Sequence, residues 1–348
     1  MNEKKWLIII SFVLVLFLGF RIMSKEKDSK EDITTKTNYI MGTIMNISIY
    51  DDVDEKIFED SFDIIRDIEK KMSLNIDDSE INNLNKNGFN NFVNVSDQTL
   101  FVLKKSMEYS KLSEGYFDVT VGPLVELWGI GSENARVPSS DEIKSAISKI
   151  DYKSVQIDGN KVKLDKDNMI IDLGGVAKGY AADEVAQYLK SKGVKKAIID
   201  LGGNVYTLGS KEKNVPWTVG IQNPLNEKRG DFIGVINVSD KSVVTSGVYE
   251  RYLEKDGKKY HHILDPFTGY PVDNELLSVT IVSNESIDGD ALSTSVFALG
   301  VQRGYELVKS LKDVEAIFVT KNKEIYITPN ISDSFEIKSK DFKIKTFK

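Results

Sequence analysis

IIDLGGVAKGYAAD, residues 170–183, predicts in succession the end of a strand, a sharp turn and the beginning of a helix. Its first six residues recur unchanged at residues 198–203. In each copy the aspartate stands where the apolar run stops, and the glycine pair allows a tight turn or a close approach of the backbone to another group. After the first copy, the apolar spacing predicts a helix that ends near Lys192 and Gly193.

The turn after the first copy is a candidate phosphate site. A strand, a glycine turn and a helix N-terminus together offer free backbone N–H groups and the positive end of a helix dipole. Lys178 lies in the first turn of the expected helix, which is an unfavourable place for a cation unless an anion binds beside it. Two tight turns that only pack closely, with a solvated Lys178, fit the pattern equally well, so both interpretations stay open at this point.

Composition excludes several classes of function. The 348 residues allow one large domain or two smaller ones, and the net charge of −7 without a clustered basic face argues against a nucleic-acid surface. The chain has no cysteine, which excludes disulfides, thiolate metal sites and a cysteine nucleophile. Its only two histidines, His261 and His262, are adjacent.

The N-terminus has the layout of a signal sequence or a short membrane anchor. Lys4 and Lys5 precede an uncharged apolar run over residues 6–20, and no cleavage site of small residues follows. We therefore expect residues 1–23 to form an uncleaved anchor, with a buried core helix as the alternative. The charged residues 24–37 predict a polar linker, which leaves residues 38–348 as the functional domain outside the cell membrane.

The periodicity of the remaining chain predicts an α+β fold, in which long helices cover one side of mostly antiparallel strands. Helices are expected over residues 54–72, 79–85, 96–113, 139–150, 290–299 and on to 311, with Ser139 and Glu142 as a capping box. Strands are expected over residues 39–50, 205–208, 217–222, 232–238, 243–246, 278–282, 316–320 and 324–328. Hairpins are expected at 155–164 and between 249–253 and 260–264. Residues 116–129 predict either a pocket wall or an irregular core segment.

A histidine pair ends the second of these hairpins and is a candidate general base. His261 and His262 precede an Asp-Pro turn at Asp265, and imidazole can accept a proton near neutral pH. Neighbouring residues of a strand point to opposite faces, so only one of the two histidines can face a given site. Two exposed histidines without a role are the alternative.

A carboxylate and a hydroxyl share one helical face further along the chain. Asp290 and Thr294 are four residues apart, and such hard oxygen ligands suit Mg²⁺ when phosphate oxygens complete its coordination. An N-terminal capping aspartate with a helix-facing threonine is the competing interpretation.

Taken together, these segments resemble the ApbE-type FAD:protein FMN transferases from Met41 to about Leu311. The resemblance rests on six motifs in the order of that family: MGT at 41–43, FDVTVGPLV at 117–125, DLGG through KGY at 172–180, TSG with YERY at 245–252, HHILDP at 261–266 and DALST at 290–294. It implies a T-fold-like ApbE-type architecture.

The resemblance also implies an activity and a set of site residues. Such enzymes need Mg²⁺, cleave the FAD pyrophosphate, attach FMN to a threonine or serine of an exported acceptor protein and release AMP. The resemblance assigns the metal to the carbonyl of Gly175 and the side chains of Asp290 and Thr294, and the role of base to His262. It assigns contacts with FAD to Met41, Tyr116, Phe117, Asp118, Asp172, Lys178 and Leu264.

Two residues depart from the family pattern. Asn75 stands where many of these transferases have a tyrosine that covers the flavin ring, and Ser293 replaces an acidic residue of some members. Loss of the aromatic cover predicts weaker flavin retention, so an FAD pyrophosphatase that yields FMN and AMP is the alternative activity. A non-catalytic flavin-binding protein and a structural membrane-tethered module are the alternatives outside catalysis.

Overall fold

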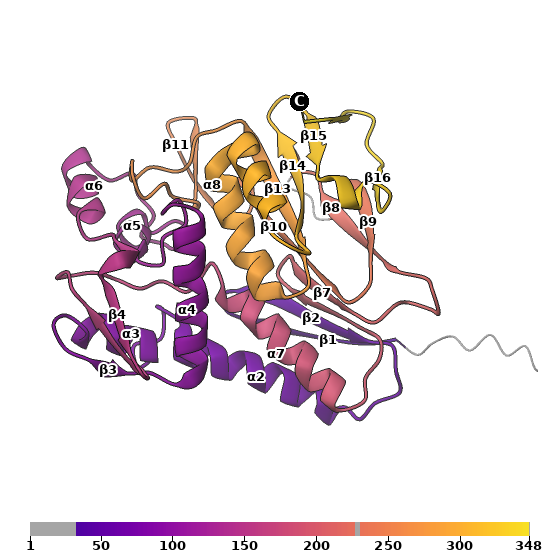
Figure 1. The fold of residues 1–348 in the computed structure, drawn as a ribbon, viewed down its shortest axis with the longest axis horizontal. Helices are drawn as coiled ribbons and strands as arrows, with labels where there is room; N and C mark the ends of the chain where they lie inside the picture. Colours follow the sequence, from indigo (N-terminus) through magenta and orange to yellow (C-terminus); the bar gives the residue numbers. More distant parts are fainter. Residues whose placement is uncertain (1–32, 227–229, 348) are drawn as a thin grey trace, which may run out of the picture.

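The structure, a computed structural model, describes residues 33–226 and 230–347 and is organised around one nine-stranded sheet (Figure 1). Each strand is antiparallel to its neighbours, except that β17 runs parallel to β15. In order across the sheet, the strands are β1 (Thr34–Ile40), β2 (Thr43–Ile49), β6 (Ala197–Leu201), β7 (Asn204–Leu208), β10 (Lys241–Gly247), β13 (Leu276–Ser283), β14 (Glu315–Thr320), β15 (Glu324–Ile327) and β17 (Lys343–Lys345).

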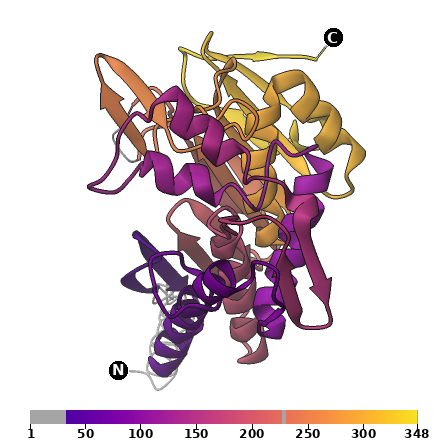
Figure 2. The same ribbon diagram turned by 90° about the vertical axis from the view of Figure 1, so that its left-hand side faces the viewer.

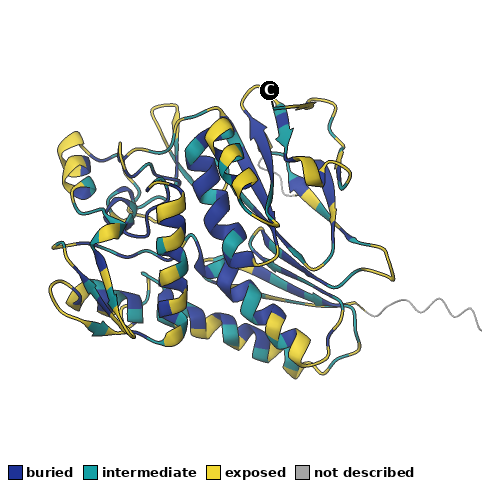
Figure 3. Ribbon diagram, viewed as in Figure 1, coloured by how far each residue is buried: buried dark blue, intermediate teal, exposed yellow. Residues whose placement is uncertain are grey.

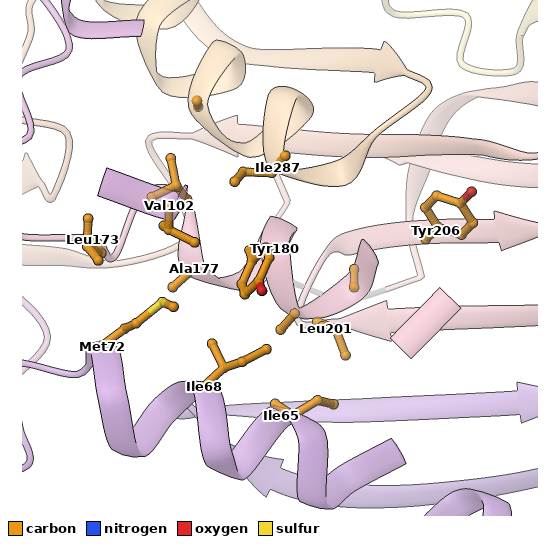
Figure 4. Close-up of a cluster of buried hydrophobic side chains, with 14 of the residues drawn as sticks. Ile65, Ile68, Met72, Val102, Leu173, Ala177, Tyr180, Leu201, Tyr206 and Ile287 are labelled. Carbon is orange, nitrogen blue, oxygen red and sulfur yellow. The ribbon is translucent and has the colours of Figure 1, made fainter. Parts of the chain in front are cut away.

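Three long helices pack together against one face of this sheet: α2 (Lys56–Met72), α7 (Ala177–Ser191) and α8 (Ser286–Ser310). Each turns a buried apolar stripe inward and a polar side outward (Figure 3). Figure 4 shows how Ile65, Ile68 and Met72 of α2 meet Ala177 and Tyr180 of α7. Non-helical backbone at Gly300 interrupts α8, as the sequence predicted with a second helix after residue 299.

A smaller sheet covers the other face near the C-terminal strands. It consists of β8 (Trp217–Gln222), β9 (Phe232–Val238) and β16 (Phe335–Ile337), in the order β16-β9-β8. Strand β14 is therefore buried on both sides, because Phe318 belongs to the core under the helices while Ile317 belongs to the core under the smaller sheet.

The remaining elements form a lobe beside the three helices, on the side that Figure 2 turns to the viewer. Its helices are α3 (Glu80–Asn87), α4 (Asp97–Leu112), α5 (Gly122–Trp128) and α6 (Ser140–Ile147). Its strands are β3 (Val93–Asn94), β4 (Val155–Asp158) and β5 (Lys161–Leu164), and a hairpin of β11 (Tyr252–Lys255) and β12 (Lys258–His261) lies nearby. Short 3₁₀ helices occur at η1 (Tyr152–Ser154) and η2 (Pro329–Ile331).

Most predicted elements are confirmed, including the capping box of Ser139 and Glu142 at α6 and the hairpin of β4 and β5. The α+β class is confirmed as well. In contrast, the single strand expected over 39–50 is wrong. Met41 and Gly42 both adopt positive φ, at 51° and 69°, and so form a tight turn between β1 and β2.

The N-terminal boundary also differs from the expectation. Strand β1 begins at Thr34, so residues 34–37, which were expected in the polar linker, pair with β2 instead. The expected anchor over 1–23 and the rest of the linker up to residue 32 lie outside the described residues. Within the described part of the chain, none of the helices has the length and apolar character needed to span a bilayer.

Candidate active site

The first IIDLGG copy is an extended segment outside the main sheet, so the strand expected there is wrong. Ile170 makes only an isolated bridge to Val121. The side chain of Asn85 supplies what a neighbouring strand would otherwise supply: it accepts the N–H of Ile171 at 2.8 Å and donates to the carbonyl of Ile171 at 3.0 Å. The carboxylate of Asp172 accepts the N–H of Gly174 at 2.8 Å and thereby holds the turn.

Helix α7 starts directly after this turn and crosses α8 at unusually close range. A Cβ on Gly179 would lie 2.4 Å from the carbonyl oxygen of Ser286, so only glycine permits this approach. The N–H of Gly179 donates to Oδ2 of Asp290 at 2.9 Å. Asp183, one turn further, accepts the N–H groups of Ser286 and Ile287 at 2.7 and 2.8 Å. The repeat and the Asp290 segment, which are more than a hundred residues apart, are therefore joined.

Lys178 and Asp290 form an ion pair at this crossing. Their Nζ and Oδ1 atoms are 3.6 Å apart, and the side chain of Asp290 is only 8% exposed while that of Lys178 is 27% exposed. The unfavourable position of Lys178 at a helix N-terminus is thus partly offset by a carboxylate of the chain itself.

Hydroxyl groups surround the other end of the same helical face. Thr294 Oγ1 is 3.4 Å from Ser246 Oγ, and Ser246 in turn lies 2.8 Å from Ser293 Oγ. Within residues 33–226 and 230–347, no three His, Cys, Asp or Glu side chains converge as metal ligands. Asp290 and Thr294 would therefore offer a cation one carboxylate and one hydroxyl from a single helical face.

His262 lies just beyond β12 with its ring fixed by Arg251. The backbone N–H of His262 donates to the carbonyl oxygen of Arg251 at 3.1 Å, and Nδ1 is 3.2 Å from the same oxygen. A carbonyl oxygen can only accept, so Nδ1 carries the proton and Nε2 is left as an acceptor. Burial, together with the charges of His261, Arg251 and Lys178, lowers the pKa of His262 to about 4, although the bond to the Arg251 carbonyl opposes this shift.

The neighbouring histidine is turned into the core, as alternation along a strand requires. His261 Nε2 is 2.9 Å from the carbonyl oxygen of Val272, and the ring packs edge-on against Phe297. Burial lowers its pKa as well. His262 is therefore the histidine whose electrostatic surroundings include Lys178 of the first copy.

Two residues predicted to contact a flavin, Phe117 and Asp172, pack against the glycines of the turn. The edge of the Phe117 ring would be 3.1 Å from a Cβ on Gly175, so this ring packs directly on the turn backbone. Burial raises the pKa of Asp172, and the charge of Lys178 opposes that rise. Burial, and then the charge of Asp172, raise the pKa of Glu126 on α5, a residue that sequence reasoning did not select.

The buried carboxylate of Asp118, another of the predicted contacts, is engaged within the fold. It accepts the N–H and the hydroxyl of Thr120 at 2.8 and 2.6 Å and the N–H of Tyr152 at 3.1 Å. Burial nevertheless raises its pKa. These bonds fix the segment that carries Phe117, so the side chain of Asp118 acts here as a support of the site.

Tyr116 and Leu264 belong to apolar contacts around the lobe. The Tyr116 ring lies 5.0 Å from the Phe267 ring and 4.7 Å from the guanidinium carbon of Arg303. Leu264 is buried in the core cluster that contains Trp128.

The last two predicted contacts stand on turns. Met41 has positive φ at the tip between β1 and β2, and its N–H donates to the carboxylate of Glu69 at 2.8 Å. Asn75 is exposed, and its N–H donates to the hydroxyl of Ser73 at 3.1 Å.

Sequence reasoning missed the residues that bring the segments together. Three residues contact the backbone of distant segments: Asn85, Gly179 and Asp183. Such contacts leave no pattern in the neighbouring sequence, so they could not be predicted from it. Ser246 and Arg251 stand in the segment 245–252, where the pattern gave them no role.

Comparisons with known proteins agree with this arrangement. The model of the ApbE family matches residues 41–318. An FAD:protein FMN transferase of Klebsiella pneumoniae (strain 342) is 38% identical over 291 residues, which cover 83% of this chain and 90% of the relative. One of Treponema pallidum (strain Nichols) is 32% identical over 322 residues, which cover 87% of this chain and 89% of the relative. The solved flavin transferase ApbE from Vibrio cholerae superposes with a TM-score of 0.79 at 29% identity and covers 87% of this chain and 99% of that chain.

Proposed function

The chain belongs to the ApbE family, and from this premise we propose that it transfers FMN from FAD to a hydroxyl of a protein acceptor and releases AMP. The observation that carries the proposal is the convergence of three segments. Lys178 pairs with Asp290 across the crossing of α7 and α8, and the charge of Lys178 also acts on His262.

His262 is the proposed base, because Nδ1 is held by a carbonyl oxygen and the ring is neutral above a pKa of about 4. Nε2 then takes the proton of an acceptor threonine or serine hydroxyl. The hydroxyl oxygen bonds to the phosphorus on the FMN side of the FAD pyrophosphate, the bond from that phosphorus to the bridging oxygen breaks, and AMP leaves with the bridging oxygen. Asp172 and Phe117 keep the turn rigid beside the reacting groups.

The side chains of Asp290 and Thr294 fit Mg²⁺, because they offer a carboxylate and a hydroxyl, to which the family resemblance adds the backbone carbonyl of Gly175. A bound Mg²⁺ would supply neutralisation of pyrophosphate charge. The chain contributes one carboxylate there, already shared with Lys178 and the N–H of Gly179, so substrate phosphate oxygens are needed to complete the coordination.

Hydrolysis of FAD to FMN and AMP is the second candidate activity. It is favoured by the exposed position of Asn75, because an amide offers less apolar cover to a flavin ring than a tyrosine does. In that case water takes the place of the acceptor hydroxyl, with the same base and the same leaving group.

The proposal includes a location. The apolar run over residues 6–20 anchors the chain in the cell membrane, and the domain that follows meets exported acceptor proteins on the outer side. Added protease should degrade the domain in intact spheroplasts. Protection of the domain until the spheroplasts are lysed would contradict an outward orientation.

The activity is tested with the full-length chain, FAD, Mg²⁺ and a protein acceptor of one of the FMN transferase relatives. We expect AMP in solution and an acceptor mass increased by one FMN less one water. The variant Asp290→Asn keeps the shape of the side chain and removes its charge, so it should lose both products. Arg66→Gln, on the exposed side of α2, is the matched control and should retain both. Absence of AMP with the native chain would overturn both enzymatic proposals and leave a flavin-binding protein.

A further inference from the structure

In the proposed mechanism, Arg251 acts only through its backbone carbonyl, which holds His262, and its side chain has no role. Its side chain is exposed and lies between two glycine turns. A Cβ on Gly42 would be 3.7 Å from the Nη2 atom of Arg251, and a Cβ on Gly131 would be 3.3 Å from its Cδ atom. Both glycines have positive φ, at 69° and 92°, so the backbone on each side leaves room for this side chain.

The charge of Arg251 is not neutralised by a described carboxylate. Among the four arginines in the described residues, Arg66, Arg136 and Arg303 form ion pairs with Asp63, Glu142 and Glu114. Within residues 33–226 and 230–347, no carboxylate forms an ion pair of this kind with Arg251, although the chain as a whole has a net charge of −7. An exposed guanidinium without a carboxylate partner retains its full capacity to bind an anion.

The positive charge of Arg251 lies close to His262, the proposed base of the reaction. The carbonyl oxygen of Arg251 holds Nδ1 of His262, and its positive charge acts on the His262 ring together with that of Lys178. Lys178 is already paired with Asp290, so it supplies only part of the charge that a pyrophosphate requires.

We propose that the guanidinium of Arg251 binds the phosphate oxygens of the FAD pyrophosphate. A guanidinium presents two parallel N–H donors to a phosphate, which fixes its orientation as well as its charge. The backbone and the side chain of Arg251 thus have separate tasks, because the carbonyl orients His262 while the guanidinium holds the group that His262 helps to cleave. The inference rests on the proposed function, since it names a substrate contact at the same site.

This separation makes a side-chain substitution informative. Arg251→Gln keeps the backbone carbonyl that orients His262 and removes the charge. Arg251→Lys restores the charge but not the paired donors. Arg66→Gln removes an exposed, paired arginine of α2 and serves as the matched control.

The test compares binding of FAD with binding of riboflavin, which has the same ring and no phosphate, by quenching of flavin fluorescence. Arg251→Gln should weaken FAD binding about 10- to 100-fold, the range for a hydrogen bond to a charged group, and change riboflavin binding less than about twofold. Arg251→Lys should be intermediate. The salt dependence of FAD binding should be shallower in Arg251→Gln than in the native chain.

Two results would overturn the inference: FAD binding unchanged in Arg251→Gln, or equal losses for FAD and riboflavin, which would indicate a structural role. Release of AMP by the native chain separates this inference from the proposed function. If the native chain releases AMP and Arg251→Gln releases it equally fast, the phosphate contact fails and the function stands. If the native chain binds FAD through Arg251 but releases no AMP, the function fails and the contact stands.

Discussion

The two IIDLGG copies have the same sequence and the same pattern of burial over their first four residues, yet they occupy different places in the fold. In the first copy Ile171 and Leu173 are fully buried, and in the second Ile199 and Leu201 are fully buried. Figure 4 shows Leu173 and Leu201 as members of one cluster of buried apolar side chains. Both copies are therefore extended, since alternate side chains of extended backbone point to opposite sides.

The copies differ in what satisfies their backbone. The second copy lies in β6, paired with β2 on one side and β7 on the other, and ends in a two-residue turn. Gly202 and Gly203 have φ values of 72° and 96°, which such a turn requires. The first copy is instead bonded to the side chain of Asn85 and, through the N–H of Asp172, to the carbonyl oxygen of Val119 at 2.8 Å. Its glycines, Gly174 and Gly175, lie outside the left-handed region.

This difference explains why only the first copy faces the site. A hairpin returns the chain into the sheet, whereas the first copy continues into α7 and carries Lys178 to Asp290. The residue at the corresponding distance from the second copy is Tyr206, within β7. Identical hexapeptides thus receive their function from the partners that the rest of the chain provides.

Replacing the two aspartates gives the largest expected contrast. Asp172→Asn keeps an acceptor for the N–H of Gly174 and removes a charge beside Lys178, so AMP release should fall about 100-fold. Asp200→Asn, which keeps an acceptor for the N–H of Gly203, should change AMP release less than about twofold. Initial rates with saturating FAD measure both. Equal losses would show that the copies are not functionally distinct.

Alanine at the first glycine of each pair should destabilise the second copy more than the first, whereas the aspartate variants affect the activity of the first copy more. Gly202→Ala forces a side chain into positive φ, with its Cβ 2.5 Å from Thr43 Oγ1, and should lower the free energy of unfolding by about 2–3 kcal/mol. Gly174→Ala should cost less than about 1 kcal/mol, but it crowds Oδ1 of Asp172 at 3.0 Å and should slow AMP release. Urea unfolding gives the energies, and a larger loss of stability in Gly174→Ala would contradict the assignment of the two turns.

A variant of Asn85 tests whether its side chain takes the place of a neighbouring strand for the backbone of the first copy. Asn85→Ala leaves the N–H and the carbonyl of Ile171 without their partner, so the free energy of unfolding should fall by about 2 kcal/mol. Asn87→Ala, on the exposed side of the same helix, should cost less than about 0.5 kcal/mol. If the two variants are equally stable, water replaces the amide without cost and the support from α3 is not needed.

The pH dependence should show the smallest effect. Burial, together with the charges of His261, Arg251 and Lys178, lowers the pKa of His262 to about 4, so the ring stays neutral from pH 8 down to pH 6. The contribution of His262 to kcat/KM for FAD should therefore change less than about twofold in this range and be lost as the pH falls through about 4. An acidic limb that depends on His262 and lies near the ordinary imidazole pKa of about 6.5 would contradict the lowered value.

Much of the fold was predictable because it depends on local patterns. A short stretch of sequence is enough to predict each of three features: the apolar stripe of α2, the capping of α6 and the Asp158-Gly159-Asn160 turn. The tight turn at Met41 was not predictable, because a methionine with positive φ carries no local signal and is held by Glu69 of α2.

The site was predictable in its parts and not in its assembly. The spacing of Asp290 and Thr294 and the position of Lys178 drew attention to two segments that the fold brings together, but their contact depends on Gly179 and Asp183 across the crossing of the two helices. The internal bonds of Asp118, and the lack of a carboxylate partner for Arg251 among the described residues, are likewise properties of the folded chain.

The most direct measurement is the fate of FMN when the full-length chain, FAD, Mg²⁺ and a protein acceptor are mixed in heavy-oxygen water. We predict that mass spectrometry finds FMN bound to the acceptor, an equal amount of AMP, and no heavy oxygen in either product, because the attacking oxygen comes from the acceptor. Free FMN with heavy oxygen on its phosphate would show hydrolysis in place of transfer. No AMP at all would contradict an enzymatic role for the site built on the first copy.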